Sequence, residues 1–150
     1  MSSVRVRTAG ADDLPGLREV FRRSSLSNAG EVEVLLAHPE VLDLPDVHVL
    51  AGRTRVAVGA EGAVVGFATL VGGGTALELE DLFVDPDRQR TGVATVLVAD
   101  AVALARGAGA ARIEVTGNPH AVAFYERAGF ERDGEVATEL GTGIRMHLDL

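Results

Sequence analysis

The chain has 150 residues, of which 47% are hydrophobic, and its formal net charge at pH 7 is −8. A chain of this length is large enough for one hydrophobic core and short for two, so the sequence predicts a single domain over residues 1–150. All 14 basic residues are arginine, and the absence of lysine excludes a Schiff-base lysine and a phosphate-loop lysine. The absence of cysteine excludes thiolate nucleophiles and cysteine-based metal sites.

The order of apolar and charged residues bears on location and partners. Charged residues or glycine interrupt each apolar stretch before it reaches membrane-spanning length, and the first residues lack the apolar core of a secretory signal. We therefore expect a soluble cytoplasmic protein with no membrane partner. The arginines are scattered through an acidic chain, whereas nucleic-acid binding needs a concentrated basic face, so no nucleic-acid partner is expected.

The N-terminal segment predicts a strand and then a helix. Val4–Thr8 alternates apolar and basic residues, as a half-buried strand does. A helix follows, with Asp12 or Asp13 as its cap and Pro15 in its first turn. The apolar residues that share one face of this helix are Leu14, Leu17, Val20 and Phe21.

The next segment predicts a short helix, an irregular stretch and an antiparallel meander. Asn28 and Glu31 have the spacing of a capping box and begin the short helix. The stretch Leu44–Arg53 is expected to be irregular. Three strands joined by glycine-containing turns are then expected at Thr54–Ala60, Ala63–Val71 and Thr75–Val84.

The C-terminal half alternates helices and strands. A long helix is expected over Val93–Ala108, and the nearly continuous apolar strand Ala111–Thr116 is typical of a sheet covered on both faces. A further helix is expected with Asn118 as its cap and Pro119 as its first residue. Strands at Phe130–Val136 and Ile144–Leu148 close the chain. This order predicts a three-layer α/β domain with a partly parallel sheet.

The segment QRTGVA, Gln89 to Ala94, joins a predicted strand to a predicted helix. Such a junction gathers unpaired backbone N–H groups and the positive end of a helix dipole, which together favour an anion. Gly92 lets a ligand approach the backbone, and Arg88 and Arg90 offer charge-assisted contacts to phosphate. An ordinary basic loop that needs a glycine explains the same spacing equally well.

Other signatures of phosphate, metal or nucleophile sites are missing. A dinucleotide fingerprint needs a third glycine three residues after its second. In the glycine-rich segment GGGTAL this position is Leu77, and in GAGAAR it is Arg112. No nucleophile-elbow pattern occurs. The histidines show no ligand pair at helical spacing, so no metal site is expected; they are His38, His48, His120 and His147.

Two blocks of this sequence resemble the GNAT superfamily of acyl-CoA-dependent N-acetyltransferases. QRTGVA resembles the signature Q/R-x-x-G-x-G/A, preceded by a strand and Asp-Pro, although Thr91 stands where arginine is frequent and Ala94 where glycine is commoner. NPHAVAFYERAGF, residues 118–130, resembles the second block of the family. The resemblance implies a single-domain α/β fold whose central mixed sheet combines an antiparallel meander with a parallel splay and is flanked by helices.

The resemblance also implies a binding site for acetyl-CoA as cosubstrate. The turn Gln89–Ala94 would bind the pyrophosphate, and pantetheine would pair with the strand Leu82–Val84, in the splay beside Ala111–Thr116. A backbone amide at the strand end would polarise the thioester carbonyl, and Asn118 would contact pantetheine or the reaction water. The cofactor-binding residues expected on this basis are Leu82, Phe83, Val84, Gln89, Arg90, Thr91, Gly92, Val93, Ala94, Thr95, Asn118 and Tyr125.

Amine acetylation needs a base and an acid. An amine with a pKa of about 10 is protonated at neutral pH, so a base or a water chain must remove a proton. Glu80 is the candidate base, with Glu78 and Asp81 beside it, and a solvated acidic strand is the alternative reading of all three. Tyr125, the only tyrosine, is the candidate acid for the CoA thiolate, and a core aromatic is the alternative. Without cysteine as an acyl carrier, direct transfer is expected.

The acceptor amine is not identified by the sequence. In the family the first two helices shape the acceptor side, and Ser24, Ser25, Ser27 and Asn28 are available there, although caps and loop hydrogen bonds explain them too. The acidic surplus favours a small cationic amine over a protein. A protein or peptide N-acetyltransferase and a non-catalytic acyl-CoA-binding sensor are the alternative functions. The sequence is also compatible with a homodimer.

Overall fold

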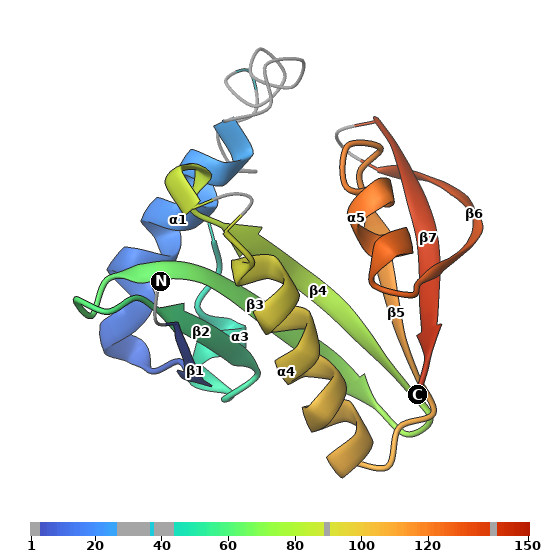
Figure 1. Ribbon diagram of the computed structural model, residues 1–150, viewed down its shortest axis with the longest axis horizontal. Helices are drawn as coiled ribbons and strands as arrows, with labels where there is room; N and C mark the ends of the chain where they lie inside the picture. The colour runs from blue at the N-terminus through green and yellow to red at the C-terminus, as the bar shows by residue number, and fades with distance from the viewer. Residues whose placement is uncertain (1–3, 27–36, 38–43, 89–90, 139–140) are drawn as a thin grey trace. The chain divides into compact units, whose positions relative to one another are not determined.

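The computed structural model describes residues 4–26, 37, 44–88, 91–138 and 141–150, and Figure 1 shows their secondary structure. The strands are β1 (Arg5–Thr8), β2 (Thr54–Val58), β3 (Val64–Gly73), β4 (Ala76–Val84), β5 (Arg112–Gly117), β6 (Glu131–Thr138) and β7 (Gly141–Asp149). The helices are α1 (Leu14–Leu26), α3 (Val47–Leu50), α4 (Val93–Gly107) and α5 (Val122–Arg127), with the 3-10 helices η1 (Ala11–Asp13) and η3 (Pro86–Arg88). In these residues no helix is long and apolar enough to cross a membrane.

The strands form a mixed sheet in the order β1-β2-β3-β4-β5-β7-β6. β1, β2 and β3 pair in antiparallel fashion, and β3 and β4 are joined by a two-residue turn, which requires them to run in opposite directions. β4 and β5 pair in parallel, whereas β7 is antiparallel to both β5 and β6. The predicted combination of a meander with a parallel pair in an α/β fold is confirmed.

Three local predictions were wrong, and one lies outside the described residues. The stretch Leu44–Arg53 contains the one-turn helix α3, which is too short for a periodic pattern and is held by the buried Val49. Helix α5 begins at Val122 instead of Pro119. In β5, Ile113 and Val115 are buried but alternate with half-exposed Arg112 and Glu114, so its pattern is not that of a strand covered on both faces. The predicted short helix at Asn28 falls outside the described residues.

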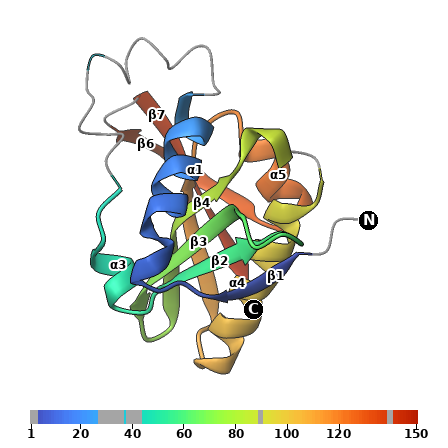
Figure 2. The same ribbon diagram turned by 90° about the vertical axis from the view of Figure 1, so that its left-hand side faces the viewer.

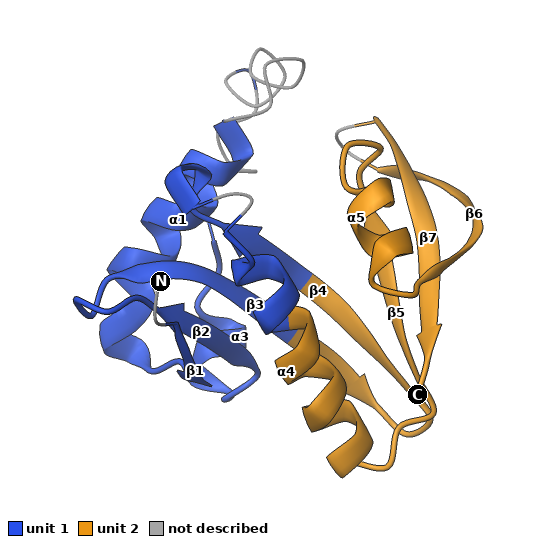
Figure 3. Cartoon of the chain, viewed as in Figure 1, with its two compact units in different colours: residues 1–69, 81–97 blue, residues 70–80, 98–150 orange. Residues whose placement is uncertain are grey.

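The chain forms two compact units, shown in different colours in Figure 3. Unit 1 comprises residues 1–69 and 81–97, and unit 2 comprises residues 70–80 and 98–150. Each unit is discontinuous in sequence because β3, β4 and α4 each contribute residues to both.

Unit 1 has a core between α1, α3 and one face of β2 and β3 (Figure 2). Its buried residues are Ala9, Leu17, Val20, Leu44, Val49, Val56 and Phe67. The predicted apolar face of the first helix, with Leu14 and Phe21 partly buried, packs on this core as expected. Phe83 of β4 joins it through ring contacts with Phe21, at a centroid distance of 4.8 Å, and Phe67, at 5.5 Å.

The start of α4 packs on the opposite face of β3 in unit 1. Gly66 lies at this contact, next to Phe67, and its missing side chain allows the close approach. A Cβ at Gly66 would lie 2.9 Å from the carbonyl oxygen of Phe83, 3.1 Å from Val93 Cγ1 and 3.2 Å from Leu97 Cδ1. The close packing of the start of α4 on β3 therefore depends on a glycine inside that strand.

Unit 2 has its own buried set, drawn from α4, α5, β4, β5 and β7 and from Phe130, which precedes β6. The buried residues are Leu79, Val98, Ala101, Ala105, Ile113, Val115, Val122, Tyr125, Phe130 and Met146. On β5 and β7 the residues that alternate with the buried ones are polar or half-exposed. One face of this part of the sheet is therefore buried, and the other carries polar side chains.

Candidate functional site

The predicted phosphate turn lies in unit 1, between η3 and α4. Thr91 donates its backbone N–H to the carbonyl of Arg88 at 3.3 Å, and its hydroxyl donates to the same carbonyl. Gly92 follows with φ at +90°, a left-handed conformation that favours glycine. α4 then begins at Val93, as predicted. Gln89 and Arg90, two of the expected phosphate ligands, lie outside the described residues.

Backbone donors are available at the start of α4. The carbonyl of Gly92 accepts the N–H of Val96 at 3.0 Å, which makes Gly92 the residue that caps the helix. The N–H groups of Gly92, Val93, Ala94 and Thr95 have no acceptor inside α4, as in the first turn of any helix. These four donors lie at the positive end of a helix of 15 residues, which is an arrangement that can bind an anion.

Space is also available at Gly92. A Cβ built on this residue meets no atom within 4 Å, and Gly92 and Thr91 are exposed. The left-handed backbone and the open space together agree with the prediction that a ligand approaches the chain here.

Strand β4 extends beyond its parallel pairing with β5. The described register runs from Ala76 with Arg112 to Leu79 with Val115, and β4 continues to Val84. Because Phe83 packs into the core of unit 1, alternation directs Leu82 and Val84 to the other face. The predicted cofactor contacts of this segment are therefore backbone groups or the side chains of Leu82 and Val84.

Asn118 lies in a turn between β5 and α5 in unit 2. Its side-chain oxygen and its backbone carbonyl both accept the N–H of Ala121, each at 3.0 Å. Pro119 occupies the second position of this turn, which suits its fixed φ. Asn118 is exposed, and its side chain orders the turn instead of capping α5 directly, so the helix begins at Val122, three residues later than predicted.

Tyr125 is buried in unit 2, with 6% of its surface exposed. Its ring makes edge contacts with Phe124, at a centroid distance of 5.4 Å, and Phe130, at 5.3 Å. Gly117 provides room for the ring, since a Cβ there would lie 3.1 Å from Tyr125 Cε2. Burial raises the pKa of Tyr125 above its ordinary value, so the hydroxyl keeps its proton at neutral pH.

An alkaline titration is expected to show this burial directly. Tyr125 is the only tyrosine and the chain has no tryptophan, so phenolate absorbance reports this residue alone. Between pH about 10 and the higher pKa of the folded state, the unfolded chain releases a proton that the folded chain keeps. Stability should therefore fall as the pH rises in this window, by about 1.4 kcal/mol per pH unit.

The measurement is chemical denaturation across the alkaline range, with Tyr125→Phe as the control. The variant has no phenol to titrate, so it should lose this part of the pH dependence. A phenolate transition near pH about 10 in the folded wild type would show instead that the hydroxyl is well solvated.

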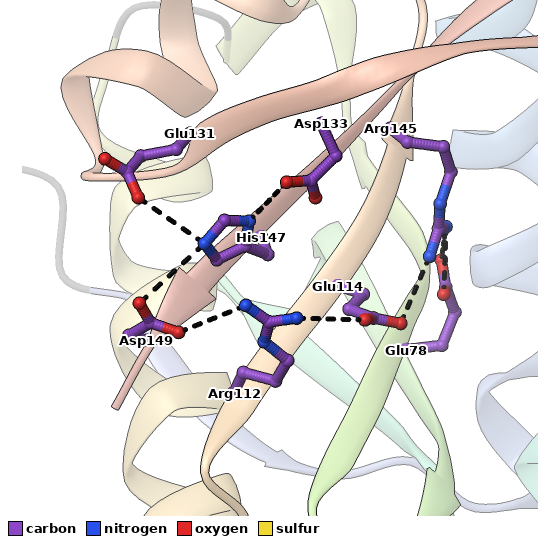
Figure 4. A network of polar contacts seen from close by, with 8 residues as sticks. All are labelled: Glu78, Arg112, Glu114, Glu131, Asp133, Arg145, His147 and Asp149. Atoms are coloured by element: carbon purple, nitrogen blue, oxygen red, sulfur yellow. Dashed lines mark hydrogen bonds and ion pairs between the residues drawn. The ribbon is translucent and has the colours of Figure 1, made fainter.

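Glu78 is held in an ion network on one face of the sheet in unit 2 (Figure 4). Arg145 Nη1 donates to Glu78 Oε2 at 2.8 Å, to Glu78 Oε1 at 3.0 Å and to Thr116 Oγ1 at 2.8 Å. Arg145 Nη2 donates to Glu114 Oε2 at 3.2 Å, and these carboxylates hold the pKa of Arg145 above its ordinary value. Glu80 is exposed and, by alternation, shares the face of Glu78.

The network continues across β7 and β6. His147 Nδ1 lies 2.7 Å from Asp133 Oδ1, and His147 Nε2 lies 3.4 Å from Glu131 Oε2 and 3.7 Å from Asp149 Oδ2. Glu131, His147 and Asp149 bring their possible ligand atoms within 4.8 Å of one another, a cluster that cross-strand pairing creates and helical spacing could not reveal. The expected absence of a metal site stays a prediction.

Several residues of these sites were not singled out from the sequence. Arg23 contacts Asp85 and Arg145 contacts Glu78, partners 62 and 67 residues away in the chain. Gly66 and Gly117 leave room for Phe83 and Tyr125, respectively. Only Gly66 carried a local signal, since a glycine within a strand pattern marks a close approach of backbone.

Solved structures similar to this chain share its fold. PaiA N-acetyltransferase from Thermoplasma acidophilum, in complex with coenzyme A, has a TM-score of 0.76 and 18% identity over 99% of each chain. A GCN5-related N-acetyltransferase from Rhodopseudomonas palustris has a TM-score of 0.77 and 24% identity, over 100% of this chain and 98% of that chain. A phosphinothricin acetyltransferase from Sinorhizobium meliloti, in complex with AcCoA, has a TM-score of 0.73 and 21% identity, over 98% of this chain and 88% of that chain.

The sequence itself was compared with curated proteins and with family models. None of the curated proteins matches it significantly. The model of the acetyltransferase (GNAT) family matches residues 18–130, which include both sequence blocks, the phosphate turn and Tyr125. The chain belongs to the acetyltransferase (GNAT) family.

Proposed function

We propose that the protein transfers an acetyl group from acetyl-CoA directly to a primary amine, and that the acceptor is a small cationic amine. The observation that carries this proposal is the phosphate turn. Gly92 adopts φ +90°, and it is followed by the first N–H groups of α4, which have no acceptor inside the helix. The anion that we assign to this turn is the pyrophosphate of acetyl-CoA, as the resemblance of QRTGVA to the family signature implies.

The remaining cosubstrate contacts follow the same assignment. Gln89, Arg90 and Thr91 would complete the pyrophosphate site, and the backbone of Leu82–Val84 would pair with pantetheine. Support for the second contact comes from the parallel ladder, because the described register ends at Leu79 and leaves these residues without a β5 partner. Asn118 would contact pantetheine or the reaction water.

Glu80 is proposed as the base. Both oxygens of Glu78 accept hydrogen bonds from Arg145, so Glu78 is already engaged in an ion pair. Glu80 is exposed, so it can receive the proton of the amine directly or through water. Tyr125 is proposed as the acid that protonates the departing CoA thiolate, because burial keeps its hydroxyl protonated.

A comparison of two glutamate variants is expected to separate these roles. Glu80→Gln should lower kcat about 10-fold, since water can replace part of a base's function. Glu78→Gln should change kcat less than this, while destabilising the fold through its contact with Arg145. Initial rates at saturating acetyl-CoA and denaturation midpoints are the measurements. A larger loss of kcat in Glu78→Gln would assign the base to Glu78.

The polar face of unit 2 supports a cationic acceptor. The network in Figure 4 contains five carboxylates, two arginines and one histidine, so it is negatively charged whether or not His147 carries a proton. Carboxylates attract ammonium groups and disfavour anionic acceptors. A cytoplasmic location, the absence of a metal and a homodimer stay predictions.

A non-catalytic acyl-CoA-binding module is the second candidate. The observation that favours it is the packing of Tyr125 between Phe124 and Phe130, because a core aromatic would have these contacts without any role in chemistry. Such a module would need the phosphate turn but neither Glu80 nor Tyr125.

The deciding experiment measures CoA release from acetyl-CoA with polyamines, amino acids, aminoglycosides, other small amines and peptides. Turnover with a small cationic amine supports the proposal, and turnover with peptides alone would make the protein a peptide acetyltransferase. Tight binding of acetyl-CoA without turnover on any acceptor would support the module. Failure to bind any acyl-CoA would exclude both.

A further inference from the structure

The last turn of α1 is tied to the segment that leads into the phosphate turn. Arg23 Nη1 lies 2.9 Å from Asp85 Oδ2, and Arg23 Nη2 lies 2.8 Å from Asp87 Oδ2. The two carboxylates hold both terminal nitrogens of one planar guanidinium, which fixes its direction. The side chain of Asp85 is 16% exposed and that of Asp87 is 77% exposed, so water screens the Asp85 pair less.

Asp85 is the central residue of this connection. Its backbone N–H donates to the carbonyl of Val65 at 2.9 Å, and its carbonyl accepts the N–H of Arg88 at 2.8 Å. Its second carboxylate oxygen accepts the N–H of Asp87 at 2.9 Å. Asp85 thus connects the end of β4 and the whole of η3 with the guanidinium of Arg23.

The connection extends to the phosphate turn. The carbonyl of Arg88 accepts both the N–H and the hydroxyl of Thr91, the residue before Gly92. A continuous path of hydrogen bonds therefore runs from Arg23 through Asp85 and Arg88 to Thr91, entirely within unit 1. Phe21, on the same helix as Arg23, packs against Phe83 at a centroid distance of 4.8 Å, so α1 is itself anchored on β4.

Removal of Arg23 would leave two carboxylates two residues apart without their shared partner. Repulsion between them would favour a different arrangement of η3, which precedes the phosphate turn. The carboxylates of Asp87 and Asp85 hold the pKa of Arg23 above its ordinary value, so the guanidinium stays charged throughout the range in which the protein would work.

We propose that Arg23 is a positioning residue for acetyl-CoA: its ion pairs with Asp85 and Asp87 hold Thr91 and Gly92 of the phosphate turn in the conformation that binds pyrophosphate. This inference rests on the proposed function of the turn. Arg23 does not touch the cosubstrate in this proposal and acts only through Asp85 and Asp87.

The test compares Arg23→Gln with Arg22→Gln. Arg22 is the neighbouring arginine of α1; it is exposed and contacts no carboxylate among the described residues. Arg23→Gln should weaken acetyl-CoA binding about 10-fold by calorimetry, whereas Arg22→Gln should stay within about twofold of wild type. S-acetylpantetheine lacks the pyrophosphate, so its affinity, measured by NMR titration, should be the same in both variants.

A double-mutant cycle adds an independent measurement. Asp85→Asn should weaken acetyl-CoA binding in the same direction. Adding Arg23→Gln to Asp85→Asn should have a smaller effect than Arg23→Gln alone, because the Arg23–Asp85 pair is already lost and only the exposed pair with Asp87 remains to be broken. If Arg23→Gln unfolds the protein, Arg23→Lys keeps the charge without the planar fork and should give an intermediate affinity.

Three results would overturn the inference. The first is that Arg23→Gln and Arg22→Gln bind acetyl-CoA with equal affinity. The second is that Arg23→Gln loses as much affinity for S-acetylpantetheine as for acetyl-CoA. The third is that the effects of Arg23→Gln and Asp85→Asn on acetyl-CoA affinity are additive. Wild-type affinity in Arg23→Lys, where that variant is needed, would also contradict it. A wild-type protein that binds no acetyl-CoA would refute the proposed function itself, which distinguishes the two failures.

Discussion

Replacing Gly92 with glutamate is expected to abolish acetyl-CoA binding while the protein still folds. Gly92 has φ +90°, a conformation that costs other residues about 1–2 kcal/mol. Its Cβ position opens onto unoccupied space, so a side chain fits there but occupies the approach to the donors of α4. A carboxylate would also compete with the pyrophosphate for these donors and repel it, and together the effects should weaken binding by about 100-fold or more.

Gly62 supplies the matched control for this change. It lies in the turn between β2 and β3, also in unit 1, with φ +84° and no atom within 4 Å of a built Cβ. Gly62→Glu should therefore lower stability by a similar amount and leave acetyl-CoA binding intact. Calorimetric titration and thermal denaturation of both variants, with Gly92→Ala as an intermediate, are the measurements. Equal affinities in the two glutamate variants would rule out pyrophosphate binding at this turn.

Local sequence signals predicted the features that depend on neighbouring residues. The boundaries of β3, β4 and α4 follow from alternation and helical period, and the place of Gly92 follows from the need for glycine at one point of a short connection. The left-handed conformation of Gly92 comes from the structure. These features are set by residues within about one turn or strand of each other. The family resemblance added the assignment of acetyl-CoA, which spacing alone left open.

Features that depend on register could not be predicted. Whether Glu78 is a free carboxylate depends on Arg145, 67 residues later in the chain, and the two meet only because β7 pairs with β5 in one particular register. Arg23 and Asp85 are 62 residues apart and meet through the packing of α1 on β4. The sequence already named Glu80 as the candidate base, and tertiary structure adds the reason to prefer it over Glu78.

Replacing Tyr125 with phenylalanine is expected to lower kcat by about 100-fold or more, the range of general acid catalysis, with the affinity for acetyl-CoA changed less than about threefold. Phenylalanine keeps the ring contacts with Phe124 and Phe130 and removes only the hydroxyl. Burial holds the pKa of Tyr125 above its ordinary value, so the wild-type hydroxyl is available as a proton donor throughout the neutral range.

The acid role of Tyr125 can be separated from a packing role by changing the leaving group. An acetyl thioester of a more acidic thiol releases a thiolate that needs less protonation, so the deficit of Tyr125→Phe should shrink with such a donor. Phe124→Leu disturbs the same aromatic contacts without touching the hydroxyl and should show no such dependence on the donor. If Tyr125→Phe retains the wild-type kcat with acetyl-CoA, Tyr125 is a core aromatic, and another group or solvent protonates the thiolate.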